Sequence, residues 1–392
     1  MSTGIRPAAR VRALPENFFG SLDRAVADAR ARGVDVIDVS KGDPDLPTPD
    51  AIVASMRAAV SDAGNHGYPA YAVRPALAEA IAKRYREDHG VDLDPDVQVA
   101  AFHGSHEGLM AAVLSLADPG DVVVVPDPGY PAYRGAAGFA GARPHPVPLP
   151  SALGHQPDFA SLATLDRAAV LLLNYPHNPT GAVATRTTFE RAVAESTRLG
   201  AAFVNDFAYS SLGFSARPLS ALTVDAERTV EVSTLSKTYN MAGWRIGYAA
   251  GAPDLIAAMR AYQAHAFSTI FGATQDAAAA ALAGDQSAAE ALVDTYRARR
   301  DLVVDGLRQQ GWDVAPSDGT FFVWVRVGGD DVEVAAHLLA HHGVAVAPGS
   351  GFGERGRGRI RLALVHPLPR LADLVARLAA ARRTLTATPK PV

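Results

Sequence analysis

Residues 233–247 read STLSKTYNMAGWRIG, and this stretch joins a lysine flanked by hydroxyls to an arginine between two glycines. An apolar run precedes it, so we expect Lys237 at the carboxyl end of a strand, with Thr234 and Ser236 beside it. An amine that attacks an aldehyde must be held in place and partly desolvated, so that some of it is neutral. Hydroxyls and the guanidinium of Arg245 are typical of a phosphate site. The pattern predicts a reactive lysine next to a bound phosphate; an isolated lysine would more simply be a solvated loop residue.

Two further segments place polar residues directly after apolar runs. Residues 174–181 read NYPHNPTG, where two X-Pro steps favour an extended, rigid turn that presents the amide of Asn178. Residues 205–209 read NDFAY, with Asp206 at the end of a run and Tyr209 three residues on. A buried carboxylate is costly unless it meets a cation, and a protonated pyridine nitrogen is one. Ligands bind at the carboxyl ends of strands in open α/β sheets, so both segments predict a site; 174–181 alone could be a plain turn.

Short apolar runs alternate with helical patterns from about residue 97 to 250. The runs are Val122–Val125, Ala169–Leu173, Ala201–Asn205 and Val230–Ser233. Strands buried on both faces have this composition, so we predict an α/β fold with a mostly parallel sheet sandwiched by helices. After about residue 290 a charged helix, short strands and a last helix predict a smaller α+β domain.

These patterns divide the chain into three parts. We predict an N-terminal arm and small-domain segment over residues 1–45 and a large ligand-binding domain over 46–290. A C-terminal small domain is predicted over residues 291–392.

Composition and charge exclude several classes of function. The 392 residues carry 41 acidic and 37 basic side chains, a formal charge of −4, which gives no reason to expect nucleic acid or an anionic membrane as partner. There is no apolar run of eighteen residues, so we expect no transmembrane helix. The chain has no cysteine, which excludes disulfides, thiolate zinc sites and a cysteine nucleophile. The twelve histidines have no metal-ligand spacing, so no metal is predicted, and a soluble cytoplasmic protein is expected.

Taken together, the three polar segments resemble the class I/II aminotransferases of pyridoxal-5'-phosphate fold type I, the aspartate aminotransferase superfamily. The resemblance runs from Gly42–Asp45 to Arg361, and the lysine segment is close to the family's Ser-x-Ser-Lys and Gly-x-Arg-x-Gly pattern. Residues 236–247 are especially similar to the branch of LL-diaminopimelate and related bacterial aminotransferases. Gly104–Gly108 and Asp127–Pro131 also resemble this family.

The resemblance implies a role for each residue around the cofactor ring. Lys237 resembles the lysine that holds pyridoxal 5'-phosphate as a Schiff base and acts as general base. Asp206 resembles the partner of the pyridine nitrogen. Asn178 and Tyr209 resemble the donors to the phenolic oxygen of the cofactor, and Tyr130 resembles the aromatic that stacks on its ring. Lys237, Asp206 and Tyr209 are therefore the expected catalytic residues.

The cofactor phosphate has its own implied ligands. Thr234, Ser236 and Arg245 resemble phosphate-binding residues. Ser105 and His106 open an expected helix whose backbone N–H groups would face the same phosphate.

Substrate binding and assembly complete the implied site. Arg361 resembles the arginine that binds the substrate α-carboxylate bidentately, and the pattern Arg-Leu-Ala-Leu favours it over the nearby Arg359. Gly42 resembles a glycine beside that carboxylate, where Asn178 is also expected. Tyr68 resembles a tyrosine that reaches the phosphate of the neighbouring subunit, so the resemblance implies a homodimer with shared active sites.

The sequence departs from the family pattern at three places. Thr234 stands where serine is usual, which keeps the hydroxyl. After Tyr71 the family commonly has glycine and then, on the next helix, a Leu-Arg pair. Here Val73, Arg74 and Leu77-Ala78 occupy that stretch, so the loop beside Tyr68 is expected to differ in shape. His106 stands where some relatives have lysine or glutamine, which affects the substrate pocket.

The function that the resemblance implies is transfer of an amino group between an α-amino acid and a 2-oxo acid. The same cofactor also serves lyases, cyclases and oxidases of specialised pathways on this fold, and the fold does not separate these from transamination. A cofactor-sensing transcription regulator is the alternative from another class. It would need a DNA-binding domain ahead of Gly42, where only about forty residues are available and no basic recognition helix is visible.

Overall fold

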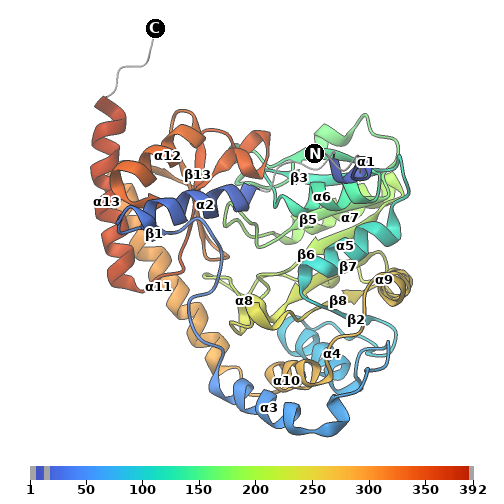
Figure 1. Cartoon of the computed structure of the whole chain (residues 1–392). Helices are drawn as coiled ribbons and strands as arrows, with labels where there is room; N and C mark the ends of the chain where they lie inside the picture. Colours follow the sequence, from blue (N-terminus) through green and yellow to red (C-terminus); the bar gives the residue numbers. More distant parts are fainter. Residues whose placement is uncertain (1–5, 13–17, 388–392) are drawn as a thin grey trace.

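A computed structural model describes residues 6–12 and 18–387 of the chain (Figure 1). Residues 1–5 and 13–17 of the predicted N-terminal arm, and residues 388–392 of the predicted C-terminal domain, lie outside the described residues. A short helix, α1 (Ala9–Arg12), precedes residues 13–17, and α2 (Phe18–Ala31) follows them.

The large sheet has seven strands in the order β2-β8-β7-β6-β5-β3-β4. The strands are β2 (Val99–Phe102), β3 (Val122–Asp127), β4 (Arg143–Pro148), β5 (Val170–Asn174), β6 (Ala202–Asp206), β7 (Thr229–Thr234) and β8 (Gly247–Gly251). The strands from β4 through β7 pair in parallel, and β8 is antiparallel to both of its neighbours. The predicted α/β fold with a mostly parallel sheet is confirmed.

Helices cover both faces of this sheet, and its central strands β5 and β6 are apolar on both faces. The covering helices are α5 (Ser105–Leu116), α6 (Ala132–Phe139) and α9 (Pro253–Ala266) on one face and α7 (Arg186–Leu199) on the other. In β5, Leu172 packs in the cluster of the first three helices, whereas Leu171 and Leu173 pack in the cluster with α7. Successive side chains of a strand point to opposite faces, so a continuous apolar run is what a two-sided cover requires.

A second, antiparallel sheet has four strands in the order β12-β13-β10-β9. The strands are β9 (Asp313–Val314), β10 (Phe322–Arg326), β12 (Ala347–Pro348) and β13 (Arg359–Ala363), and the neighbouring helices are α11 (Ser287–Gln309), α12 (Asp331–His342) and α13 (Leu368–Ala387). A two-stranded parallel sheet joins β1 (Ile37–Asp38) to β11 (Val344–Ala345), which brings the start of the chain next to its last third. The boundaries predicted at residues 45 and 290 stay predictions; α11 runs through the second of them.

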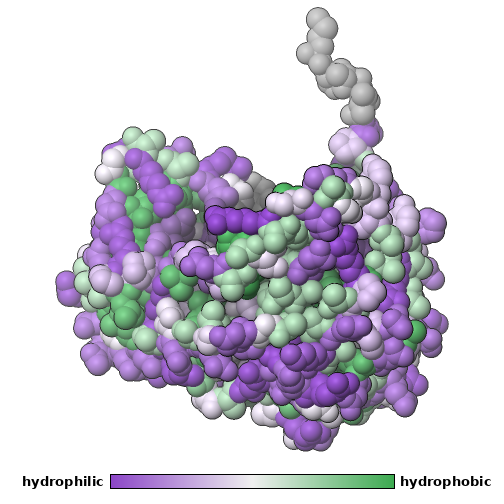
Figure 2. All heavy atoms as spheres, turned by 90° about the horizontal axis from the view of Figure 1, so that it is seen from below, coloured by the Kyte–Doolittle hydropathy of each residue, from purple (hydrophilic) through white to green (hydrophobic). Residues whose placement is uncertain are grey.

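The remaining helices lie at the lower end of the molecule in Figure 1. They are α3 (Asp50–Ser61), α4 (Pro75–His89) and α10 (Gly272–Ala283). The short α8 (Leu235–Thr238) lies elsewhere, directly after β7 at the edge of the large sheet. Seen from below, this end mixes hydrophilic and hydrophobic residues (Figure 2). Within residues 6–12 and 18–387, no helix combines the length and apolarity that a membrane crossing requires.

Three neighbouring parallel strands end at the same edge of the large sheet. Strands β5, β6 and β7 end at Asn174, Asp206 and Thr234. The register pairs Asn174 with Asp206, so the segments that follow these strands start side by side. This edge positions the polar segments that the sequence singles out.

Candidate active site

A cavity of about 420 Å³ lies at the carboxyl ends of these strands. It gathers twelve of the thirteen residues that the sequence proposes for the site: Gly42, Ser105, His106, Tyr130, Asn178, Asp206, Tyr209, Thr234, Ser236, Lys237, Arg245 and Arg361. The thirteenth, Tyr68, does not line the cavity, and its side chain is 96% exposed. Several other residues line the cavity that the sequence did not predict, among them Asp23, Lys41, Asp43, Asn174 and Phe322.

Lys237 sits in the one-turn helix α8, whose N-cap is Thr234. The Thr234 hydroxyl accepts a 3.1 Å hydrogen bond from the backbone N–H of Ser236, which fixes the start of this turn. The Nζ atom of Lys237 donates a 2.7 Å hydrogen bond to the backbone carbonyl of Gly42. Burial lowers the pKa of Lys237 to about 8, so a useful fraction of the amine is neutral near physiological pH. A nucleophilic amine needs this combination of fixed position and lowered pKa.

Asp206 ends strand β6 and is 5% exposed. Its Oδ2 atom accepts a 2.7 Å hydrogen bond from the phenol of Tyr133, and its Oδ1 atom accepts a 3.1 Å bond from the N–H of Ala208. Burial nevertheless raises the pKa of Asp206 to about 6. A cation at this carboxylate would lower that pKa and remove the cost of burying the charge.

Asn174 connects two of the predicted segments, although no role of its own was predicted for it. Its side-chain N–H₂ donates a 2.8 Å hydrogen bond to the backbone carbonyl of Asp206. Its Oδ1 atom accepts a 2.8 Å bond from the backbone N–H of Asn178. One buried amide therefore holds the turn that carries Asn178 against the strand that carries Asp206.

Aromatic rings form the walls of the cavity. Tyr209 is buried and lies edge-on to Phe321 and Phe322, with ring centroids 5.5 and 5.8 Å apart. On the helix side, the ring of Tyr130 is 6.4 Å from that of His106, at 85°. Two aromatic walls suit a flat ligand ring.

One end of the cavity suits an anion. Helix α5 begins there at Ser105, and its N-terminal N–H groups carry partial positive charge. Arg245 lies against the same helix start and donates a 3.3 Å hydrogen bond to the carbonyl of His103. A Cβ atom on Gly104 would lie 2.5 Å from Nη2 of Arg245, and one on Gly247 would lie 2.7 Å from the Ser105 nitrogen. Glycine at both positions lets the guanidinium and the helix start approach this closely.

Arg361 lies in strand β13 and is 2% exposed. It donates a 2.9 Å hydrogen bond to Oδ1 of Asn178 and a 2.7 Å bond to the carbonyl of Ser40. The rings of Phe322 and Phe352 lie 4.1 and 4.7 Å from its guanidinium carbon. Burial lowers the pKa of Arg361 to about 10, which leaves it charged at neutral pH. A cation held rigidly between two rings is well prepared for a carboxylate.

The ring of Phe322 packs against both Gly42 and Arg361. A Cβ atom on Gly42 would lie 2.5 Å from Cζ of the Phe322 ring, so any larger residue would displace the ring. Gly42 therefore supports two site residues at once, since its carbonyl accepts from Lys237 and its missing side chain leaves room for Phe322.

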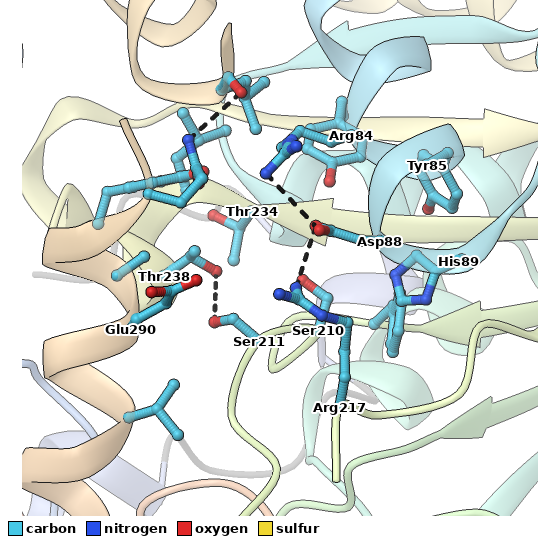
Figure 3. A pocket seen from close by; sticks show the side chains of 18 residues that line it. Arg84, Tyr85, Asp88, His89, Ser210, Ser211, Arg217, Thr234, Thr238 and Glu290 are labelled. Carbon is cyan, nitrogen blue, oxygen red and sulfur yellow. Dashed lines mark hydrogen bonds and ion pairs between the residues drawn. The ribbon is translucent and has the colours of Figure 1, made fainter. Parts of the chain in front are cut away.

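A second pocket, of about 70 Å³, lies beside the turn that carries Lys237 (Figure 3). Its wall includes Thr238, whose hydroxyl accepts a 3.0 Å hydrogen bond from Ser211 on the loop after β6. The carboxylate of Asp88 lies between two arginines in this pocket: Arg84, at 3.6 Å, and Arg217, at 3.1 Å. A pocket of this volume has room for only a few water molecules, so the larger cavity is the one that can take the ligands. The hydrogen bond between Ser211 and Thr238 joins the loop after β6 to α8 beside this pocket.

Comparison with known proteins finds relatives that match nearly the whole chain. The family model described as aminotransferase class I and II matches residues 34–378. An LL-diaminopimelate aminotransferase of Desulforudis audaxviator is 43% identical and is matched over 95% of this chain and 96% of its own. An L-glutamine–4-(methylsulfanyl)-2-oxobutanoate aminotransferase of Bacillus subtilis is 41% identical, over 93% and 94% of the two chains. The substrate-bound structure of BacF from Bacillus subtilis superposes with a TM-score of 0.91 at 35% identity, covering 96% and 98%.

Proposed function

The chain belongs to the aminotransferase class I and II family, and from this premise we propose which side chain performs each part of its reaction. It is a pyridoxal-5'-phosphate-dependent aminotransferase that moves an amino group between an α-amino acid and a 2-oxo acid. The lyase, cyclase or oxidase alternative has no support among these relatives, which are named as aminotransferases or, for BacF, as a transaminase. The relatives differ in the amino acids that their names give, so the substrate of this chain is a separate question.

The residues of the cavity fit this cofactor at three points. Lys237 offers a buried amine of lowered pKa for the aldehyde carbon. Asp206 offers a buried carboxylate of raised pKa for the protonated ring nitrogen. Arg245 and the start of α5 at Ser105 offer positive charge for the phosphate. When bound, the cofactor supplies an electrophilic carbon and a ring that accepts electrons.

We propose that Lys237 binds the cofactor covalently and moves a proton at the substrate Cα. Its burial supports both tasks, because the neutral amine is the form that attacks carbon and accepts protons. The hydrogen bond to Gly42 holds Nζ at one place in the cavity. The single observation that carries the proposal is that this amine, the Asp206 carboxylate and the Arg361 guanidinium line one cavity.

Asp206 and its neighbours are proposed to hold the cofactor ring. Asp206 would keep the ring nitrogen protonated, and the Tyr133 hydrogen bond keeps the carboxylate oriented. Asn178 and Tyr209 would donate to the phenolic oxygen, and Tyr130 would stack on the ring; all three line the cavity.

The remaining residues of the cavity are proposed to bind the cofactor phosphate and the substrate carboxylate. Thr234, Ser236 and Arg245 would bind the phosphate together with the N–H groups at Ser105 and His106. Arg361 would bind the substrate α-carboxylate, with Asn178 and Gly42 beside it. The stacking of Arg361 on two phenylalanine rings supports this role, because a pre-oriented guanidinium loses little freedom on binding.

We also propose a homodimer in which Tyr68 reaches the partner's phosphate. Of the eleven exposed large hydrophobic side chains among the described residues, five lie in residues 60–71 and 267–271. These five are Val60, Tyr68, Tyr71, Phe267 and Phe271. Exposed apolar groups concentrated in two short segments are typical of an interface. The cytoplasmic location stays a prediction.

A spectroscopic screen of amino donors tests the reaction. We expect the visible absorbance of the bound cofactor to fall when a donor amino acid is added, and to return with a 2-oxo acid. Lys237→Ala should lose both the covalently bound cofactor and the turnover, whereas Lys83→Ala on the surface of α4 should keep them. A variant without Lys237 that still turned over at the wild-type rate would contradict the assignment.

A further inference from the structure

The segment of residues 40–42 runs directly between the two ends of the proposed reaction. The carbonyl of Ser40 accepts a 2.7 Å hydrogen bond from Arg361, and the carbonyl of Gly42 accepts a 2.7 Å bond from Lys237. Lys41 is the residue between Ser40 and Gly42, and each neighbouring Cα atom is about 3.8 Å from its own. The hydrogen bonds from Arg361 and Lys237 therefore hold the backbone on both sides of Lys41.

The side chain of Lys41 also lines the cavity, where it meets a charge from another element. Asp23 of helix α2 forms an ion pair with Lys41 and lines the same cavity. The two side chains are 49% and 42% exposed, respectively, so the pair remains accessible to a ligand in the cavity. The proposed chemistry of Lys237, Asp206 and Arg361 leaves this pair without a task.

We propose that Asp23 and Lys41 form a specificity subsite for the end of the substrate side chain. The pair favours an end that both donates and accepts hydrogen bonds, such as a carboxamide or a second ammonium–carboxylate group. This inference rests on the proposed function, because it assumes that the α-carboxylate lies on Arg361.

The physical reason is that the subsite offers a cation and an anion together. A carboxylate end is attracted by Lys41 but repelled by Asp23, and an ammonium end has the reverse problem. An apolar end would cover both charges without giving either a hydrogen bond. An end with a donor and an acceptor satisfies both charges.

Near-isosteric amino donors test this selection in the wild-type holoenzyme. Glutamine offers a donor and an acceptor, glutamate offers acceptors alone, ornithine offers an ammonium, and methionine offers an apolar end. We expect kcat/KM for glutamine to exceed that for each of the other three by roughly tenfold. A wild-type enzyme that prefers methionine over glutamine would overturn the inference.

Single substitutions give a result of definite sign. Asp23→Asn removes the anion, so the glutamate-to-glutamine ratio of kcat/KM should rise roughly tenfold. Lys41→Gln removes the cation, so the ornithine-to-glutamine ratio should rise by a similar factor. The matched control is Asp313→Asn, which removes a carboxylate from an exposed pair with Arg326 in the second sheet and should move neither ratio.

The alternative role of the pair is to hold helix α2 in place. In that case both variants would lower kcat/KM for all four donors equally, the ratios would stay constant, and the inference would be wrong. If either variant unfolds, the charge-swapped double variant Asp23→Lys, Lys41→Asp keeps an ion pair. We expect the swap to retain the preference for glutamine over glutamate and ornithine; loss of that preference in a folded swap would count against the inference. A wild-type enzyme that uses no amino donor would instead refute the proposed function.

Discussion

The phenol of Tyr133 donates a 2.7 Å hydrogen bond to Oδ2 of Asp206, and both side chains are buried. This bond lowers the pKa of Asp206, whereas burial raises it to about 6. Tyr133 comes from helix α6, which makes the sheet-covering helix part of the support for the proposed site.

Removing the Tyr133 hydroxyl should lower kcat more than it changes KM. In Tyr133→Phe we expect kcat to fall by roughly tenfold with little change in KM, because Asp206 loses a bond that favours its charged form. Steady-state kinetics with one amino donor measures both constants. Tyr262→Phe, in helix α9 on the same face of the sheet, is the control and should keep wild-type kinetics. A larger change in KM than in kcat would assign Tyr133 to substrate binding instead.

The interior strands could be predicted from the sequence because buried strands are short runs of mainly apolar residues. Strands β5 and β6 are apolar on both faces, whereas β7 is apolar on one face and buries Thr229, Glu231 and Ser233 on the other. Each of the three strands is followed by a polar segment, so both the sheet and its active edge could be inferred. The edge strand β4 reads RPHPVP and was missed, since proline is unusual in strands and no apolar run is present. Strand β8 reads GYAAG, whose small residues carry little strand signal.

Site residues without a motif could not be found from the sequence in the same way. Asp23 and Lys41 meet because α2 packs near the second sheet, while residues 41–43 line the cavity. Asn174 was visible at the end of its run, but its role depends on the register that pairs it with Asp206. Contacts of this kind depend on the fold rather than on local spacing.

Asp206 should impose a pH-dependent stability on the cofactor-free protein. Its pKa is raised from 3.8 to about 6 by burial, so the folded state binds this proton more tightly than the unfolded state. The resulting stabilisation is present below about pH 4 and is lost as the pH rises through about 6. Asp206→Asn should therefore be more stable than wild type above pH 7, by on the order of 1–3 kcal/mol.

Urea unfolding of the cofactor-free proteins at pH 4.5 and pH 8 measures this difference. We expect the advantage of the Asn variant to shrink at the lower pH and to disappear in the holoenzyme, where the carboxylate faces a cation. A difference that is the same at both pH values would contradict the linkage.

The amine of Lys237 should react at lower pH than an ordinary lysine. Burial lowers its pKa from 10.5 to about 8, so its neutral fraction rises about tenfold per pH unit below that value and levels off above it. Competitive labelling of the cofactor-free protein with acetic anhydride, read by peptide mass spectrometry, follows this titration. A lysine-containing model peptide serves as the reference. A midpoint near that of the peptide would mean that the cavity does not desolvate the amine.

Gly42→Ala should damage substrate binding through Phe322. The added Cβ would lie 2.5 Å from the ring, and this ring lies 4.1 Å from the guanidinium carbon of Arg361. We expect KM for the amino donor to rise by tenfold or more, with a smaller fall in kcat, because a misplaced guanidinium weakens carboxylate binding. Gly135→Ala in α6 has open space around its Cβ position and should keep wild-type constants. If Gly42→Ala and Gly135→Ala had the same KM and kcat, Phe322 would not transmit the effect of Gly42 to Arg361.

The proposed homodimer makes a prediction that mixing two inactive chains can test. Tyr68 is 96% exposed and lies outside the cavity of its own chain, whereas Lys237 lines that cavity. If Tyr68 acts across the interface, a heterodimer of Tyr68→Phe and Lys237→Ala chains has one site with both lesions and one site with neither. We expect activity to return to as much as half the wild-type value per heterodimer, since one of its two sites is intact.

The matched control replaces Tyr68→Phe by Tyr71→Phe, a second exposed tyrosine of the same loop. That chain should be active alone, so mixing it with Lys237→Ala should give no gain beyond its own contribution. Val73 and Arg74 follow in this loop, where the family pattern differs, so the loop is also the place where shared geometry would first fail. If Tyr68 acted within its own chain, every site in the first mixture would keep a lesion and no activity would return. Sedimentation of the holoenzyme at micromolar concentration completes the test, because a fully active monomer is incompatible with a site that needs the partner's tyrosine.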